Sequence, residues 1–371
     1  MSVYLDYAST TPLCKAAVDV VQQGLHLFGN PSSTHAIGRA QKSQIELSRR
    51  QLAEALGVTA AELFFTSGAT EGINTFMASW AQKHTGRTLY CSKLEHKAVL
   101  DAAAFYCKLF GCRLVFLSNN ALGEIDLEVL NTAQKNDLVA MMWFNNEIGN
   151  RNPIEMVSQM ALKQGFFFLC DAVQGLGQYT INWGGLEGLH MAVASAHKFG
   201  GPQGVGLAYL KKGVPYVAQL YGGVQERERR AGTENTLGIR AMTAAFKWHS
   251  ANAERHLAQK QSLGEVLRQA LRGIPELEQN GLGTHREHHA GILNIRLPYR
   301  DKPELLLFKL DLAGFCVSQG SACTSGSQKA SHVIEALGRN NPPYASIRIS
   351  FSYRTTPEEL MGFANALARL V

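Results

Sequence analysis

The sequence lacks the features that mark an exported, membrane-spanning or disulfide-linked protein. Its start, Met-Ser-Val-Tyr4, is not the basic segment and apolar stretch of a secretory signal. No apolar run reaches about 18 residues, the length that predicts a membrane helix. The seven cysteines form no Cys-x-x-Cys pair, so neither a disulfide framework nor a zinc site is indicated. We therefore expect a cytoplasmic protein without a membrane span or a metal, in a compartment that keeps thiols reduced.

Charge is also sparse. Charged residues make up 18% of the 371 residues and the net charge is +6, whereas hydrophobic residues make up 46%. This composition supports a large buried core and disfavours disorder. The basic residues are scattered apart from a short cluster of Arg227, Arg229 and Arg230, and a nucleic-acid groove needs a denser stripe. We expect no direct nucleic-acid binding and interpret the positive charge as attraction for anionic ligands.

The middle of the chain alternates short apolar runs with stretches of helical period. Strands separated by helices, such as Thr70–Lys83 and Ile154–Lys163, predict an α/β fold with a mostly parallel sheet. Several runs are apolar throughout, which suits strands covered on both faces. The predicted strands are Leu63–Thr66, Thr88–Cys91, Leu114–Leu117, Leu138–Phe144, Phe166–Cys170, Met191–Ser195 and Val205–Leu210.

The pattern changes after about residue 240, where a smaller α+β region begins. A long helix is predicted over Arg240–Gly273, followed by strands at Ile292–Arg296 and Ile347–Phe351. Thr356-Pro-Glu-Glu359 combines an N-cap, a proline and a capping-box glutamate, which predicts the start of a final helix. We find no repeat or flexible linker and expect the two parts to pack as one unit.

Polar and small residues follow several predicted strands, where ligands collect in open α/β sheets. Phe65-Thr-Ser-Gly-Ala-Thr70-Glu joins a strand to a helix, and its amide groups could hold a phosphate, although a plain capped turn has the same pattern. His96 could stack on a planar cofactor or be merely structural. Asp171 directly follows an apolar strand and could cap a helix or pair with a pyridinium N–H.

Lys198 and Cys323 carry the sharpest hypotheses. Most lysines are solvated, but Lys198 follows an apolar strand and precedes a glycine-rich turn. An amine that is partly shielded from water in such a place has a lowered pKa and can form a Schiff base. Ser195 and His197 could donate to the phosphate of the same ligand. Cys323 lies among small residues in Gly320-Ser-Ala-Cys-Thr-Ser-Gly326, which favours a mobile nucleophilic thiol over an inert surface cysteine.

Taken together, these motifs resemble the cysteine desulfurases of the NifS/IscS-like group, within the class V aminotransferase family. The matching stretches run in order along nearly the whole chain, and Ser-Ala-Cys-Thr-Ser separates this group from general aminotransferases. They are Tyr4-Leu-Asp-Tyr-Ala-Ser-Thr-Thr-Pro12, Gly29-Asn-Pro-Ser-Ser33, Thr66-Ser-Gly-Ala-Thr-Glu71, Glu95-His96, Asn145-Asn-Glu-Ile-Gly149, Asp171-Ala-Val-Gln174, Ser195-Ala-His-Lys198, Arg230-Ala-Gly-Thr-Glu-Asn235, Gly320-Ser-Ala-Cys-Thr-Ser325 and Ile347-Arg-Ile-Ser350.

The resemblance implies a fold-type I pyridoxal-phosphate enzyme with a large cofactor-binding domain at residues 13–245. Residues 1–12 and 246–371 would form a small domain that carries the cysteine loop. Lys198 would hold pyridoxal 5′-phosphate as a Schiff base, and Arg348 would clamp the substrate carboxylate, with Asn146 beside it. The other implied cofactor contacts are His96 on the ring face, Asp171 on the ring nitrogen, Gln174 on the ring hydroxyl, Ala69, Thr70, Ser195 and His197 on the phosphate, and Thr233 on the phosphate of the other subunit of a homodimer.

The implied reaction converts L-cysteine to L-alanine. Lys198 would move the α proton, and the Cys323 thiolate would take the substrate sulfur as a persulfide. The sulfur would then pass to an acceptor protein for iron–sulfur cluster assembly or tRNA thiolation. A selenocysteine lyase or another β-eliminating lyase on the same fold is the nearest alternative, and a sulfur-relay or scaffold protein with a degenerate site is a more distant one.

The chain departs from this group in two places. Many members carry Glu-Pro-Ser after the cysteine loop, where this chain has Lys329-Ala-Ser331. The chain stops at Val371, whereas better-known members have a further C-terminal tail that helps to hold an iron–sulfur scaffold protein. We expect partner recognition to differ at these two places.

Overall fold

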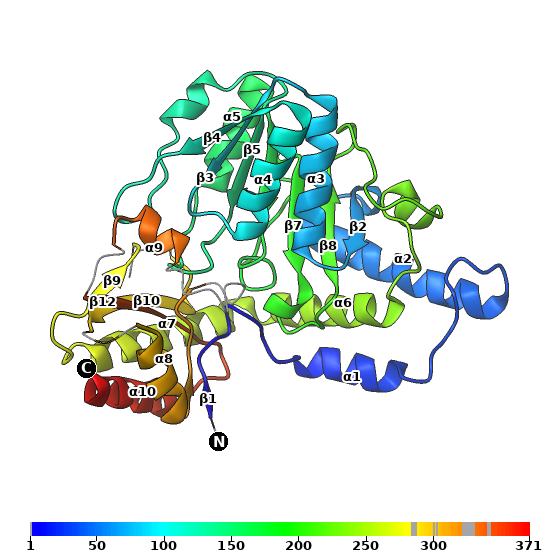
Figure 1. Ribbon diagram of the computed structural model, residues 1–371. Coiled ribbons are helices and arrows are strands. Elements are labelled where there is room, and N and C mark those ends of the chain that lie inside the picture. The colour runs from blue at the N-terminus through cyan, green and yellow to red at the C-terminus, as the bar shows by residue number, and fades with distance from the viewer. Residues whose placement is uncertain (1, 283–287, 300, 302, 321–330, 340–342) are drawn as a thin grey trace.

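A seven-stranded sheet forms the centre of the protein (Figure 1). The structure, a computed structural model, describes residues 2–282, 288–299, 301, 303–320, 331–339 and 343–371. The strands, in the spatial order β2-β8-β7-β6-β5-β3-β4, are β2 (Leu63–Thr66), β3 (Thr88–Ser92), β4 (Arg113–Leu117), β5 (Leu138–Met142), β6 (Phe167–Asp171), β7 (Met191–Ser195) and β8 (Gly206–Leu210). Only β8 runs antiparallel to its neighbours, β2 and β7, which confirms the predicted mostly parallel sheet.

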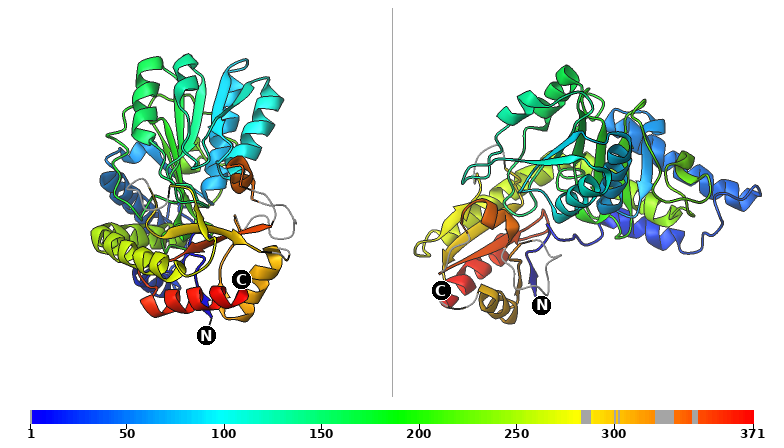
Figure 2. Two further views of the ribbon diagram at one scale, coloured as in Figure 1. Left: turned by 90° about the vertical axis from the view of Figure 1, so that its left-hand side faces the viewer. Right: turned by 45° about the horizontal axis from the view of Figure 1, so that its top comes forward.

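Helices cover both faces of this sheet, as Figure 2 shows from two further sides. They are α1 (Lys15–Gly24), α2 (Ala36–Leu56), α3 (Ala69–Lys83), α4 (Lys97–Phe110), α5 (Ile154–Gln164) and α6 (Thr236–Ala251). Alternate residues of each strand enter two separate cores: Leu138 and Ala140 pack with α3 and α4, and Val139 and Met141 pack with α2, α5 and α6. This double coverage explains why the strands read as continuous apolar runs.

A smaller α+β region packs beside the large sheet. Its three-stranded antiparallel sheet has the order β12-β10-β9 and a separate core that includes Leu267, Ile295 and Phe363. The N-terminal strand pairs in parallel with β11, so the start of the chain lies against its C-terminal part (Figure 1). The elements are β1 (Val3–Tyr4), α7 (Ala253–Leu271), β9 (Glu278–Asn280), β10 (Ile292–Pro298), α8 (Pro303–Leu312), β11 (Phe315–Cys316), α9 (His332–Ala336), β12 (Tyr344–Ser350) and α10 (Pro357–Leu370).

Several predictions about element boundaries were wrong, including the start of β12, which is Tyr344 and not the predicted Ile347. The single helix expected over Arg240–Gly273 is two helices, because the backbone leaves the helical region at Asn252 (φ −118°, ψ 11°) between α6 and α7. Strand β5 ends at Met142, two residues before the predicted end, and the Glu95 side chain accepts the Met142 N–H at 2.8 Å.

Other local predictions hold. Thr356 and Glu359 form the reciprocal capping box at the start of α10, with distances of 2.8 and 3.2 Å. The predicted domain boundary between residues 245 and 246 falls inside α6, and it stays a prediction. Within the described residues, no helix combines the length and the apolar character that crossing a membrane requires.

Candidate active site

A cavity of about 200 Å³ opens at the carboxyl ends of β5, β6 and β7. It lies where the large sheet meets β12 and the N-terminal segment, both of which contribute to its lining. Ten of the twelve residues predicted for the site line it: Ala69, Thr70, His96, Asn146, Asp171, Gln174, Ser195, His197, Lys198 and Arg348.

Lys198 is the last residue of a short 3-10 turn, Ala196–Lys198, that directly follows β7. Its Nζ donates to the carbonyl oxygens of Ala8 and Ser9 at 2.8 and 2.7 Å. Gln178 holds the lysine backbone through a hydrogen bond to the Lys198 carbonyl at 3.1 Å. The amine is therefore held at the cavity wall by the N-terminal segment, and the turn places its backbone.

Asp171 ends β6 and is buried, with only 7% of the residue exposed. Burial raises its pKa to about 6, although the Val173 N–H, which donates to Oδ1 at 3.0 Å, and the charge of Lys198 act in the opposite direction. The carboxyl group has this one hydrogen bond among the described residues, so a cationic N–H bound in the cavity would stabilise it. Gln174, one turn further on, donates to the Ala8 carbonyl at 2.9 Å, the same oxygen that Lys198 contacts.

The strand-to-helix turn before α3 lies against the end of β7. The Ala69 N–H, at the start of α3, donates to Ser195 Oγ at 2.9 Å, and Thr70 is exposed. A Cβ on Gly206 would come within 2.6 Å of Gly68 Cα, so only glycine lets β8 approach this turn so closely. The positive end of the α3 dipole and these polar groups could hold a phosphate.

The two histidines of the cavity are neutral at physiological pH. Burial, and next the charge of Lys198, lower the pKa of both His96 and His197 to about 4. His96 caps α4, and its Nδ1 accepts the Ala98 N–H at 3.1 Å, which leaves the proton on Nε2. His197 Nδ1 lies 3.1 Å from Thr10 Oγ1.

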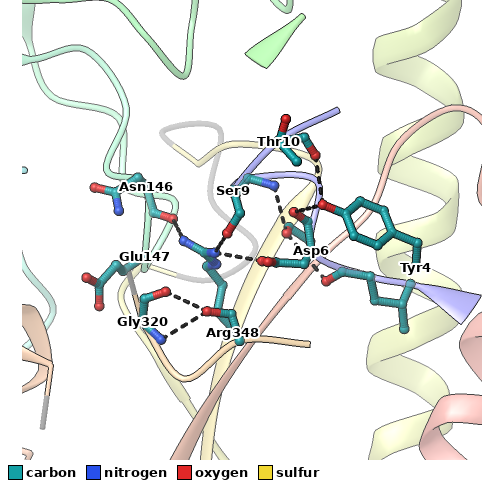
Figure 3. A network of polar contacts seen from close by, with 12 residues as sticks. Tyr4, Asp6, Ser9, Thr10, Asn146, Glu147, Gly320 and Arg348 are labelled. Atoms are coloured by element: carbon teal, nitrogen blue, oxygen red, sulfur yellow. Dashed lines mark hydrogen bonds and ion pairs between the residues drawn. The ribbon is translucent and has the colours of Figure 1, made fainter. Parts of the chain in front are cut away.

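Arg348 is a buried cation at the other wall of the cavity, and it is 1% exposed. Figure 3 shows Asp6, Ser9 and Asn146 converging on its guanidinium. Its Nη2 donates to Asp6 Oδ1 at 2.7 Å and to Ser9 Oγ at 2.6 Å, and its Nη1 donates to the Asn146 carbonyl at 2.9 Å. Its Nε has no hydrogen-bond partner among the described residues, and a ligand carboxylate would supply one.

Sequence reasoning assigned no role to Ala8, Ser9 or Asp6, although they contact Lys198 and Arg348. All three lie in the matching stretch from Tyr4 to Pro12, so the motif drew attention to the segment. Nothing local in it indicates a partner 342 residues away, the separation between Asp6 and Arg348.

Of the other two predicted residues, the structure describes only Thr233. Thr233 is exposed on the segment before α6 and does not line the cavity. Cys323 lies outside the described residues. The roles of the twelve site residues therefore remain predictions, and ten of them now share one cavity.

Comparison with known proteins places the chain in a family. Residues 3–363 match the family described as Aminotransferase class-V, and the chain belongs to it. Enzymes of this family depend on pyridoxal phosphate, as the sequence predicted.

Within that family, the chain is similar to cysteine desulfurases. It is 36% identical over 379 residues to "Cysteine desulfurase IscS" of Dictyoglomus turgidum, with 100% of this chain and 94% of the relative covered. A solved NifS-like protein matches with a TM-score of 0.91 and 29% identity over 100% of this chain and 99% of the other. A structure described as "SspA in complex with cysteine" matches with a TM-score of 0.81 and 26% identity over 96% and 100% of the two chains.

The cavity fits pyridoxal 5′-phosphate at its aldehyde, its ring nitrogen and its phosphate. The Lys198 amine would hold its aldehyde carbon, and the buried Asp171 carboxyl suits a protonated ring nitrogen. The start of α3, with Ser195 and His197 beside it, suits the phosphate. The neutral His96 ring lines the same cavity and is available to the ring face.

Proposed function

We propose that this protein is a pyridoxal-phosphate-dependent cysteine desulfurase that converts L-cysteine to L-alanine and passes the sulfur to Cys323 as a persulfide. The observation that carries the proposal is the arrangement of Lys198, Asp171 and Arg348 around one cavity. This set provides an amine, an acid for a ring nitrogen and a buried guanidinium for a carboxylate. The similarity to cysteine desulfurases over the full chain supports the choice of substrate.

Arg348 selects and orients the amino acid. Because Asp6, Ser9 and the Asn146 carbonyl already hold two of its nitrogens, the guanidinium is fixed before the substrate arrives. A carboxylate bound by a fixed, buried cation gains a charge-assisted hydrogen bond at a low ordering cost. The amino group and the side chain of the substrate are then directed toward Lys198.

Lys198 and His96 are the groups that move protons. When bound, the cofactor supplies an electron sink for the electrons of the broken Cα–H bond. Lys198 Nζ would take the α proton, and the carbonyls of Ala8 and Ser9 would keep the amine at the cavity wall. His96 is neutral with its proton on Nε2, so it can donate to the substrate side chain from that atom.

The sulfur leaves by transfer to a thiolate. Cys323 Sγ attacks the substrate sulfur, an S–S bond forms and the Cβ–S bond breaks. The electron pair of the Cβ–S bond stays on the carbon fragment, which gains a proton and leaves as alanine. The products are alanine and a Cys323 persulfide, and no external oxidant or reductant is consumed.

We propose further that the enzyme is a cytoplasmic homodimer that delivers sulfur to an acceptor protein. Several large apolar side chains are exposed near the α1–α2 connection, including Leu25 (67%), Phe28 (73%), Tyr221 (82%) and Val224 (73%). Gln225 donates a hydrogen bond of 3.3 Å to Ser32, which joins the segment that holds Tyr221 and Val224 to the α1–α2 connection. An apolar surface of this kind suits a second copy of the chain, and Thr233 on the same segment would reach the phosphate site of that copy.

Replacement of the proposed nucleophile tests the function. We expect Cys323→Ala to lose alanine release from L-cysteine and to form no protein persulfide, while its cofactor absorbance stays like that of the wild type. Cys112→Ala is the matched control, because Cys112 lies outside the cavity, and it should keep full activity. Alanine release and persulfide content are measured for each variant with and without added pyridoxal phosphate.

Each result has a definite meaning. Full-rate alanine release by Cys323→Ala would disprove persulfide transfer. Sulfide and pyruvate in place of alanine would identify a β-eliminating lyase. A protein that gained no cofactor absorbance with added pyridoxal phosphate would be a relay or scaffold, a role that the shared cavity of Lys198, Asp171 and His96 disfavours.

A further inference from the structure

The arginine cluster of the sequence lies in a strained segment next to Ser67 and Gly68, the turn between β2 and α3 where a phosphate would bind and which we call the phosphate turn. Glu226, Arg227 and Glu228 have φ angles of 48°, 57° and 63°, a left-handed conformation that non-glycine residues rarely adopt. Three such residues in a row are unfavourable and persist only where surrounding contacts hold them. The segment needs an anchor, and the structure shows one.

Glu226 is that anchor. Its Oε1 and Oε2 accept from Arg49 Nη2 and Nη1 at 2.9 and 2.6 Å, and both side chains are at least 97% buried. Glu226 Oε2 also accepts the Phe65 N–H at 2.9 Å. Because Phe65 is the penultimate residue of β2, the strained segment is fixed to the strand that leads into the phosphate turn.

Arg230 extends from this segment to the phosphate turn itself. Its Nε donates to Glu71 Oε1 at 3.0 Å and its Nη2 to Oε2 at 3.4 Å. Glu71 Oε2 in turn accepts the Ser67 N–H at 2.8 Å. Burial acts to raise the pKa of Glu71, but the hydrogen bonds from Arg230 and Ser67 outweigh it, so the pKa is lowered and the carboxylate is charged.

The Arg230–Glu71 ion pair offsets a negative charge close to the place where a phosphate would bind. Glu71 lies in the first turn of α3, within two residues of Ala69 and Thr70, so its negative charge is close to the place where a phosphate would bind. An unpaired carboxylate there would repel the phosphate. Arg230 neutralises that charge and keeps the carboxylate turned toward Ser67.

We infer that Arg230 and Glu71 are positioning residues for the cofactor phosphate, with Arg230 held in place by the Arg49–Glu226 anchor. The inference rests on the proposed use of pyridoxal phosphate and adds two residues that do not line the cavity. They act on the turn at Ser67, and through it on Ala69 and Thr70. The same segment carries Thr233, so in a dimer one strained loop would serve the phosphate sites of both subunits.

The test compares two ligands that differ only in the phosphate. The apoprotein is titrated with pyridoxal 5′-phosphate and with pyridoxal, and binding is followed by absorbance and by protein fluorescence. We expect Arg230→Met to weaken pyridoxal 5′-phosphate binding about tenfold, the usual scale for loss of a residue that orients a direct contact, and to leave pyridoxal binding within about twofold. Arg227→Met is the matched control: this arginine of the same segment donates to the Ala60 carbonyl and to Glu46, away from the turn, and its loss should change neither affinity.

A second substitution tests the electrostatic cause. Glu71→Gln keeps an oxygen for the Ser67 N–H and removes the charge, so the double variant Arg230→Met, Glu71→Gln should recover most of the lost affinity for pyridoxal 5′-phosphate. An unchanged Arg230→Met, equal losses for both ligands, or a double variant weaker than the single one would each overturn the inference. A wild-type protein that bound neither ligand would instead contradict the proposed function, and the two failures are therefore distinguishable.

Discussion

At the scale of single residues, charge is placed in this site by partners from distant parts of the chain. Arg348 is 1% exposed and is charge-paired with Asp6, which lies near the N-terminus. A buried cation without a partner is costly, so Asp6 both stabilises Arg348 and fixes the direction of its free donors. Asp6 does not line the cavity, so it should act on the substrate only through Arg348.

We therefore expect Asp6→Asn to raise the KM for L-cysteine about tenfold and to leave kcat within about threefold, because the guanidinium loses its orienting charge but the proton-transfer groups stay in place. Steady-state alanine release measures both constants. Asp19→Asn is the control, since Asp19 pairs with Lys15 at 2.9 Å on the exposed face of α1. An Asp6 variant with an unaltered KM would show that Arg348 needs no partner.

At the scale of elements, helix starts place the functional groups. His96 is the N-cap of α4, and Ala69 is the first residue of α3. Both residues therefore lie between the end of a strand and the start of the next helix. The sequence predicted these junctions because caps and strand ends have local signatures. It missed the break at Asn252 because no proline or glycine stands there, and the residues on both sides have helical patterns.

The capping box of α10 gives a prediction at this scale. Thr356→Ala should lower the free energy of unfolding by about 1 kcal/mol, since the Glu359 N–H loses its side-chain acceptor. Urea unfolding followed by circular dichroism measures the change. Glu358→Gln, an exposed change in the same first turn that leaves the box intact, should cost less than half as much. Equal losses in the two variants would mean that the box adds no stability.

At the scale of the whole molecule, a buried polar cluster joins the two parts of the protein. His249 lies in the last turn of α6, His256 lies in α7, and Tyr353 stacks on His256 with ring centroids 4.0 Å apart. Burial, and next the nearby His256 and Lys260, lower the pKa of His249 to about 3 from an ordinary value of 6.5. The folded protein therefore keeps His249 neutral, whereas the unfolded chain takes up a proton below pH 6.5.

This difference predicts acid sensitivity. The unfolded state binds more protons between pH 6.5 and about 3, so the contribution of His249 is fully present above that range and is lost as the pH falls through it. The loss between pH 7 and pH 5 is about 2 kcal/mol for such a residue. Asp171, whose pKa is raised from 3.8 to about 6, acts in the opposite direction between those two values.

The measurement is thermal unfolding at pH 7 and pH 5. His249→Phe removes the titrating ring, so its Tm should fall less between the two pH values than that of the wild type. His26→Phe replaces an exposed histidine and should keep the wild-type difference. If the His249 variant kept the full difference as well, the acid sensitivity would have another origin.

The sequence by itself determined the family, the cofactor class, the mostly parallel sheet and most of the residues that line the cavity. These features depend on residues close together in the chain, such as Ser195-Ala-His-Lys198, where periodicity and caps leave a readable pattern. Only the tertiary structure decided that Asp6 pairs with Arg348, 342 residues away, and that Arg49 pairs with Glu226, 177 residues away. Such pairs depend on how the β-strands and the N-terminal segment pack, and packing between distant segments leaves no local signature in the sequence.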